Sequence, residues 1–136
     1  MEVSDDRQCF VCGPENKDGL QAVFTVEQPR ASSCCRLAIP SRFQGWEGIV
    51  HGGILATLLD EAVIYACRAL GEQFVTAELT VRYKKPVPVE TEITVRARVR
   101  EQKRRLLTTS AWIEISGEVY AEADAKVFRL DKSEQS

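Results

Sequence analysis

Residues 51–70 read HGGILATLLDEAVIYACRAL, in which two glycines precede an uninterrupted run of helix-forming residues. Within this run the apolar residues recur every three or four positions, which is the spacing of one face of an α-helix. We therefore expect a helix from Gly52 to about Leu70, with one broad side buried and Gly71 as its C-terminal stop. The start of such a helix presents free backbone N–H groups and a partial positive charge, which can bind an anion or a carbonyl oxygen.

Two adjacent carboxylates, Asp60 and Glu61, lie about two turns into this helix. The helical neighbours of Asp60 are uncharged, so we expect a poorly neutralised carboxylate that accepts a proton readily. Glu61 has Arg68 further along the helix as an electrostatic partner, which favours a supporting role for it. The helix thus combines an electrophilic end with a candidate base, as the hydrolysis of an acyl group requires.

The segments on both sides of the helix alternate between apolar and polar residues, which predicts strands with one buried face. We expect these strands at residues 20–28, 33–39, 74–87, 92–100, 107–115 and 119–130. The residues 103–105 between two of them predict a hairpin turn. In the last strand Ala121, Ala123 and Ala125 leave room for the helix to lie against the sheet. This order predicts an α+β fold with an antiparallel sheet covering one long helix.

The overall composition indicates one ordinary globular domain of 136 residues with a formal charge of −2. This balance gives no reason to expect nucleic acid as a partner. We also expect no membrane partner, since the sequence has no long apolar stretch free of charges. Residues 1–18 are predicted to be a loop-rich lead-in, and their acidic start lacks the features of a signal peptide. We therefore expect a cytoplasmic protein.

Cys9 and Cys12 flank the start of a segment that is rich in turn-forming residues. A closed structural zinc site needs four ligands, usually from two close pairs. We expect no metal here and interpret the two cysteines as small apolar groups beside a turn. The other candidate ligands are scattered along the chain, at Cys34, Cys35, Cys67 and His51.

Three segments carry a resemblance to a known family: residues 43–60, FQGWEGIVHGGILATLLD; residues 75–87, VTAELTVRYKKPV; and CFVCG at residues 9–13. Together they resemble the hotdog-fold acyl-CoA thioesterases of the PaaI-like group. The resemblance implies a single hotdog domain over residues 1–136, with an antiparallel sheet wrapped around the central helix. It also implies a homodimer or a dimer of dimers, with active sites built from two chains.

The same resemblance assigns roles to individual residues. The Gly52 N–H would polarise the thioester carbonyl, His51 would shape the site, and Gly53 would help bind the coenzyme A ester. Asp60, from the opposite subunit, would act as general base on water or as nucleophile. Thr76 would position the water or the carboxylate.

Two departures leave parts of this assignment open. Some family members carry an asparagine shortly before the histidine, where this chain has residues 45–47, GWE. Other hotdog thioesterases use a glutamate on this helix, so Glu61 also stays a candidate for the working carboxylate.

The expected reaction is hydrolysis of an acyl-CoA thioester to the free acid and coenzyme A. We expect no cofactor, because coenzyme A is part of the substrate. Two alternatives remain: a hotdog hydratase or dehydratase acting on hydroxyacyl thioesters, and a non-catalytic acyl-CoA-binding domain. The sequence does not reveal the acyl group.

Overall fold

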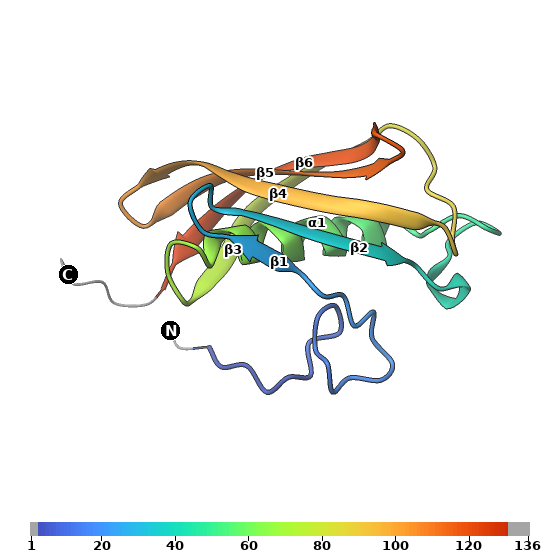
Figure 1. The fold of residues 1–136 in the computed structure, drawn as a ribbon, viewed down its shortest axis with the longest axis horizontal. Helices are drawn as coiled ribbons and strands as arrows, with labels where there is room; N and C mark the ends of the chain where they lie inside the picture. Colours follow the sequence, from blue (N-terminus) through green and yellow to red (C-terminus); the bar gives the residue numbers. More distant parts are fainter. Residues whose placement is uncertain (1–2, 131–136) are drawn as a thin grey trace.

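The computed structural model describes residues 3–130, and residues 1–2 and 131–136 lie outside this description. Along the chain, a lead-in without regular structure comes first, then two strands, one long helix and four more strands (Figure 1). The elements of the described chain are β1 (Thr25–Glu27), β2 (Ser32–Ala38), the 3₁₀ helix η1 (Ser41–Phe43), α1 (Gly52–Cys67), β3 (Phe74–Tyr83), β4 (Glu92–Lys103), β5 (Leu106–Ile115) and β6 (Glu118–Arg129).

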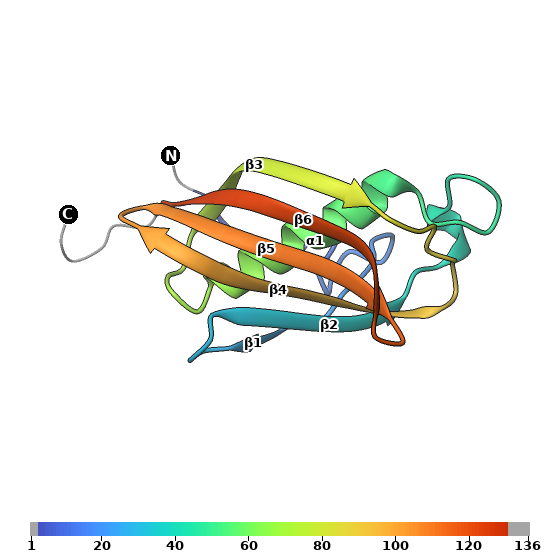
Figure 2. The same ribbon diagram turned by 90° about the horizontal axis from the view of Figure 1, so that it is seen from above.

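The strands form one antiparallel sheet in the order β1-β2-β4-β5-β6-β3, seen from above in Figure 2. Tight turns join β4 to β5 and β5 to β6. In these turns Arg104 and Gly117 adopt φ values of 59° and 82°, the left-handed conformation that short hairpins require. The predicted turn at residues 103–105 is thereby confirmed. The sheet ends at β3 on one side, and this strand pairs with β6 alone among the described strands.

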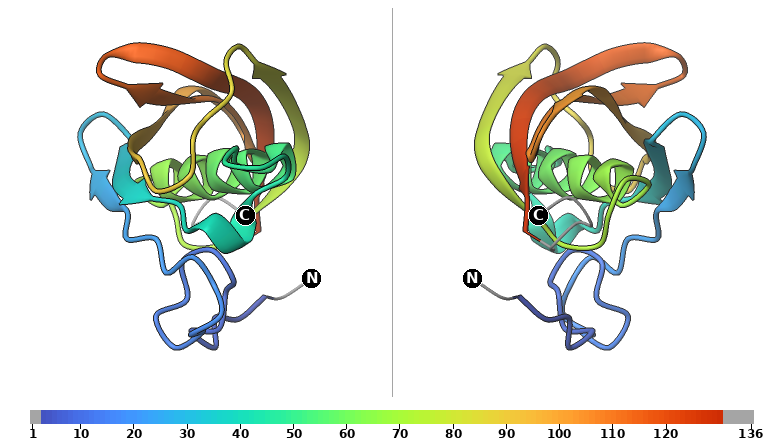
Figure 3. Two further views of the ribbon diagram at one scale, coloured as in Figure 1. Left: turned by 90° about the vertical axis from the view of Figure 1, so that its right-hand side faces the viewer. Right: turned by 90° about the vertical axis from the view of Figure 1, so that its left-hand side faces the viewer.

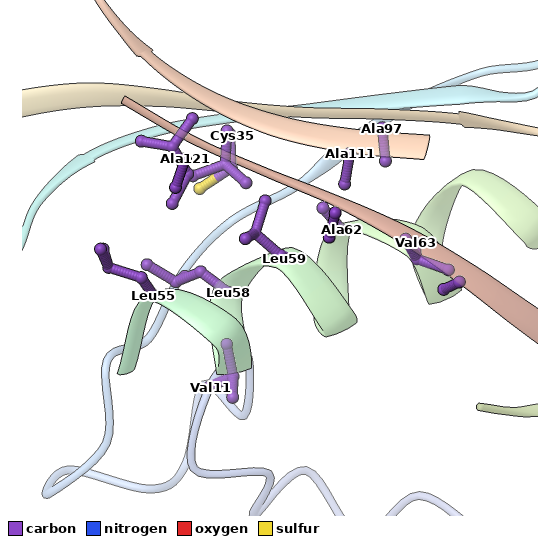
Figure 4. Close-up of a cluster of buried hydrophobic side chains, with 14 of the residues drawn as sticks. Val11, Cys35, Leu55, Leu58, Leu59, Ala62, Val63, Ala97, Ala111 and Ala121 are labelled. Atoms are coloured by element: carbon purple, nitrogen blue, oxygen red, sulfur yellow. The ribbon is translucent and has the colours of Figure 1, made fainter. Parts of the chain in front are cut away.

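The sheet curves around α1, which runs along its concave face (Figure 3). The buried face of the helix includes Leu58, Leu59 and Ala62, each with no exposed surface. Ala111 and Ala121 lie opposite them on the inner face of the sheet (Figure 4). Because these alanine side chains are short, the helix axis can approach the sheet closely while the leucines fill the space between. The predicted α+β arrangement is confirmed.

The end of α1 differs from the expectation. The helix ends at Cys67 rather than near Leu70, and Arg68 caps it with a backbone N–H that bonds back to the preceding turn. Gly71 is not the C-terminal stop. A Cβ on Gly71 would lie 2.9 Å from the ring of Phe74, so close packing explains the glycine there.

Two strands are shorter than expected. The first, predicted over residues 20–28, is reduced to β1 because residues 20–24 lie along the lead-in instead. The third ends at Tyr83 rather than at Val87, because residues 84–88 form the connection to β4 and contain two prolines. No helix among the described residues is long and apolar enough to cross a membrane.

The lead-in lies on the side of α1 that the sheet leaves uncovered (Figures 1 and 3). Val11 inserts into the core and is only 2% exposed; it lies below the helix in Figure 4. The N–H of Leu20 donates to the carbonyl of Phe10, and that of Ala22 donates to the carbonyl of Val11. The lead-in is therefore an integral part of the folded domain.

Candidate active site

The N-terminus of α1 is capped by His51, which has an extended backbone with φ −60° and ψ 135°. Its Nδ1 accepts a hydrogen bond of 2.9 Å from the N–H of Gly53. Because Nδ1 is an acceptor, the neutral ring carries its proton on Nε2. The Gly53 N–H is therefore already bonded to the capping side chain. The Gly52 N–H has no acceptor within residues 3–130, as is usual for the first residue of a helix.

Gly52 lies at the edge of a surface cavity of about 390 Å³, lined by Gly45, Trp46, Val50, His51 and Gly52. The side chain of Trp46 is 85% exposed at its rim. The hydroxyl of Tyr83 donates to the Gly52 carbonyl at 2.8 Å. Sequence reasoning missed Tyr83, because no pattern in the chain connects it to a glycine 31 residues earlier.

Asp60 lies half-buried on α1 and accepts a hydrogen bond of 2.5 Å from the hydroxyl of Thr76 on β3. Thr76 stands at a β-bulge, since Thr76 pairs with Val127 and Glu78 pairs with Lys126. A bulge of this kind changes the direction of the side chains beside it. Within the described chain Asp60 forms no ion pair. The structure thus brings together two of the candidate residues, Asp60 and Thr76.

Glu61 has different surroundings, on the side of the helix that faces the lead-in. Its Oε2 lies 2.7 Å from the Sγ of Cys12 and 3.6 Å from the Sγ of Cys9. Burial, and secondarily the hydrogen bond to Glu61, raises the pKa of the Cys12 thiol to about 12. The expected partner of Glu61, Arg68, instead lies over the ring of Tyr65 at 4.3 Å from its centroid.

The geometry of α1 keeps the Gly52 N–H and the Asp60 carboxylate of one chain far apart. Gly52 and Asp60 are eight residues apart, which corresponds to about 12 Å along the helix axis. One thioester carbonyl cannot contact the Gly52 N–H and have its water activated by Asp60 of the same helix. The two groups can serve one reaction only if they come from different chains.

Comparison with known proteins places these features in a family. The family model described as "Thioesterase superfamily" matches residues 47–127, more than half of the chain, including α1 and most of the sheet. The crystal structure of a thioesterase superfamily protein superposes with a TM-score of 0.85 and 27% identity, over 95% of this chain and 68% of that one. The PaaI protein of E. coli has the same fold, with a TM-score of 0.70 and 22% identity over 75% of each chain. The predicted hotdog fold is confirmed.

Curated relatives agree with this assignment. The acyl-coenzyme A thioesterase THEM4 of Rattus norvegicus is 34% identical over 133 residues, which cover 96% of this chain and 57% of that protein. The corresponding protein of Bos taurus is 28% identical over 131 residues, covering 95% and 54%. The chain therefore spans about half the length of the curated relatives it matches. On the matched family model, the fold and these similarities, the chain belongs to the thioesterase superfamily.

Proposed function

We propose that this chain hydrolyses acyl-CoA thioesters to a free acid and coenzyme A. The observation that carries the proposal is the pair of Asp60 and Thr76. A half-buried carboxylate without a cationic partner in the described chain is held in one orientation by a hydroxyl donor. Such a carboxylate is suited to accepting a proton from water. Membership of the thioesterase superfamily and the similarity to acyl-coenzyme A thioesterases support the choice of substrate.

In the proposed reaction Asp60 takes a proton from a water molecule, and the water oxygen attacks the thioester carbon. The carbonyl oxygen becomes negative and receives a hydrogen bond from the Gly52 N–H of the other chain. The tetrahedral intermediate then collapses, the carbon–sulfur bond breaks, and Asp60 returns its proton to the departing thiolate. Direct attack by Asp60 on the carbonyl carbon is the second route: the carbon–sulfur bond breaks, the coenzyme A thiolate leaves, and water then cleaves the resulting anhydride to the free acid and the Asp60 carboxylate.

The proposal includes a homodimer, because one helix cannot supply both groups to one carbonyl. The outer edge of β3 supports this, since no other strand among residues 3–130 pairs with it, and its ten residues present backbone groups that a second copy can pair with. Tyr83, at the end of that strand, is 54% exposed. Pairing of dimers into a tetramer stays a prediction, as do a cytoplasmic location, the lack of a cofactor, and the lack of nucleic acid and membrane partners.

The cap at His51 favours hydrolysis over hydration of an enoyl thioester. A hydratase that uses histidine as its base needs an unprotonated ring nitrogen facing the substrate. In this chain Nδ1 is occupied by the Gly53 N–H, and Nε2 carries the proton. His51 is therefore placed to donate a hydrogen bond to the substrate, and Asp60 is left as the base.

A panel of short, long and aromatic acyl-CoA esters, with detection of the released thiol, tests the proposed function. We expect turnover of at least one saturated or aromatic ester. Turnover of enoyl or 3-hydroxyacyl esters without thiol release would instead indicate a hydratase or dehydratase. Tight binding of the esters without any turnover would indicate a binding domain and contradict the proposal.

A further inference from the structure

The lead-in turn at Cys9–Gly13 brings two thiols to one carboxylate on α1. Among residues 3–130, Cys9, Cys12 and Glu61 form a group whose ligand atoms all lie within 4.8 Å of one another. We propose that Cys9, Cys12 and Glu61 bind a zinc ion that fastens the lead-in to the helix. This site is separate from the proposed chemistry at Asp60, although it shares the same helix.

The turn holds the two sulfurs in a fixed geometry. The Sγ of Cys9 accepts hydrogen bonds from the backbone N–H groups of Val11, at 3.4 Å, and Cys12, at 3.5 Å. Such donors stabilise negative charge on a sulfur, as a metal-bound thiolate requires. The Gly13 N–H closes the turn by donating to the Cys9 carbonyl at 2.8 Å, and the buried Val11 anchors it in the core.

Gly13 is required for this turn. A Cβ at this position would lie 2.4 Å from the backbone nitrogen of Cys9, so any other residue would force the turn open. The turn is therefore closed by the protein alone, and both cysteines lie beside Glu61 before any ion arrives. Pre-positioned ligands lower the entropic cost of binding.

The choice of zinc follows from the ligand atoms. The two thiolates are soft ligands that select zinc over magnesium or calcium, and zinc also accepts a carboxylate oxygen, with bonds of about 2.3 Å to sulfur and about 2.0–2.2 Å to oxygen. Tetrahedral coordination with these lengths separates neighbouring ligand atoms by about 3.5–4 Å. The distance of 3.6 Å between Cys9 Sγ and Glu61 Oε2 fits this geometry. The 2.7 Å between Cys12 Sγ and Glu61 Oε2 fits after a side-chain movement of under about 1 Å.

Neighbouring groups complete the surroundings of the site. Tyr65 lies one turn after Glu61 on the helix. Its ring stacks on that of Phe24 with centroids 4.8 Å apart, so an aromatic pair covers the helix beside the site. All three proposed ligands are half-buried, so an ion can reach them from solvent, and water would complete its coordination. This proposal departs from the expectation of no metal at Cys9 and Cys12, because the third ligand lies 49 residues after Cys12 and only the folded chain brings it to them.

Metal analysis of the full chain, purified without a tag and without chelators, tests the proposal. We expect about one zinc per chain in the unaltered protein and almost none in Cys12→Ser or Glu61→Gln. Cys34→Ser is the matched control, because Cys34 is also a half-buried free thiol but lies on β2 outside the cluster. This variant should keep its zinc.

A second measurement starts from the unaltered protein, so its main result does not depend on how a variant folds. After removal of bound metal, the unaltered protein is titrated with Co²⁺, and the thiolate-to-cobalt charge-transfer absorption is recorded. A saturable band at one ion per chain, lost in Cys9→Ser and kept in Cys34→Ser, supports the site. Absence of both zinc and the cobalt band would overturn the proposal. A Cys9–Cys12 disulfide in the freshly purified protein, located by peptide mapping under non-reducing conditions, would also overturn it.

Discussion

Asp60 and Glu61 are consecutive residues of α1, yet their carboxylates contact different parts of the structure. Asp60 accepts a hydrogen bond from Thr76 on β3, and Glu61 contacts the thiols of Cys9 and Cys12 in the lead-in. A step of about 100° per residue around a helix explains this difference. One carboxylate faces the edge strand of the sheet and the other faces the lead-in below it. The geometry therefore favours Asp60 as the base, a choice that the sequence left open.

The first prediction separates these two carboxylates. Asp60→Asn preserves the shape of the side chain but removes its capacity to accept a proton. We expect kcat to fall by at least about 10²-fold, the usual contribution of a general base. Glu61→Gln should lose much less activity. Steady-state rates on the best ester of the panel check this, and an Asp60→Asn variant as fast as the unaltered protein would rule out Asp60 as base.

The second prediction concerns Thr76 as a positioning residue. Thr76→Val keeps the β-branched shape but removes the donor to Asp60. A hydrogen bond to a charged group contributes about 1.5–3 kcal/mol, so we expect kcat to fall by roughly 10-fold or more with a smaller change in KM.

Thr76→Ser is the control for this variant, because it restores the hydroxyl without the methyl group. We expect it to recover most of the lost rate. Equal losses in Thr76→Val and Thr76→Ser would mean that packing at the bulge, and not the hydrogen bond, explains the effect.

Much of the fold could be predicted from the sequence because its signals are local. The glycines at positions 52 and 53 and the helical spacing after them located the start of α1, and period-two alternation located the long strands. The predicted end of α1 was wrong because Gly71 resembles a C-terminal cap in the sequence, whereas its small size is needed for contact with Phe74. Local patterns do not report such packing.

The candidate site could be predicted only in part, for a similar reason. Asp60 and Thr76 were both named, but no local pattern indicated the bulge beside Thr76 or the direct hydrogen bond between the two side chains. Likewise, Arg68 was the expected partner of Glu61 because it lies on the same helix. The actual contacts come from Cys9 and Cys12, which only the folded lead-in brings to that face.

The third prediction tests the Gly52 N–H with a backbone change. Gly52→Pro removes this N–H, which bonds to nothing within the described residues. Proline is well tolerated at the first helical position, and the extended backbone of His51 is the conformation that a residue before proline adopts. We therefore expect a folded protein whose kcat is lower by about 10²–10³-fold, as for loss of one oxyanion donor.

Gly52→Ala is the matched control for the proline variant. A Cβ at position 52 lies 3.3 Å from the Tyr83 ring in both variants, but only the alanine variant keeps the backbone N–H. If Gly52→Ala loses as much activity as Gly52→Pro, the contact with Tyr83 explains the loss and the role of the N–H is refuted.

The fourth prediction separates capping from catalysis at His51. His51→Ala removes the acceptor for the Gly53 N–H and should lower the free energy of unfolding by about 1 kcal/mol, the usual value of an N-cap. His51→Asn supplies a good capping side chain and should recover that stability. It lacks the Nε2–H donor, so its activity should stay low. Thermal unfolding and kcat measured on both variants check this, and recovery of activity in His51→Asn would leave His51 with a capping role alone.

The fifth prediction tests whether two chains build each site. Asp60→Asn retains the Gly52 N–H, and Gly52→Pro retains the Asp60 carboxylate, so each homodimer lacks a complete site. In a mixed dimer, one of the two sites receives both functional groups because they come from different chains. We therefore expect co-expressed or refolded mixtures to regain activity that neither variant has alone. If the mixed dimers form, as shown by differently tagged chains that purify together, and yet stay inactive, then Gly52 and Asp60 do not build one site across two chains. That outcome would contradict the proposed mechanism, because about 12 Å of helix separates them.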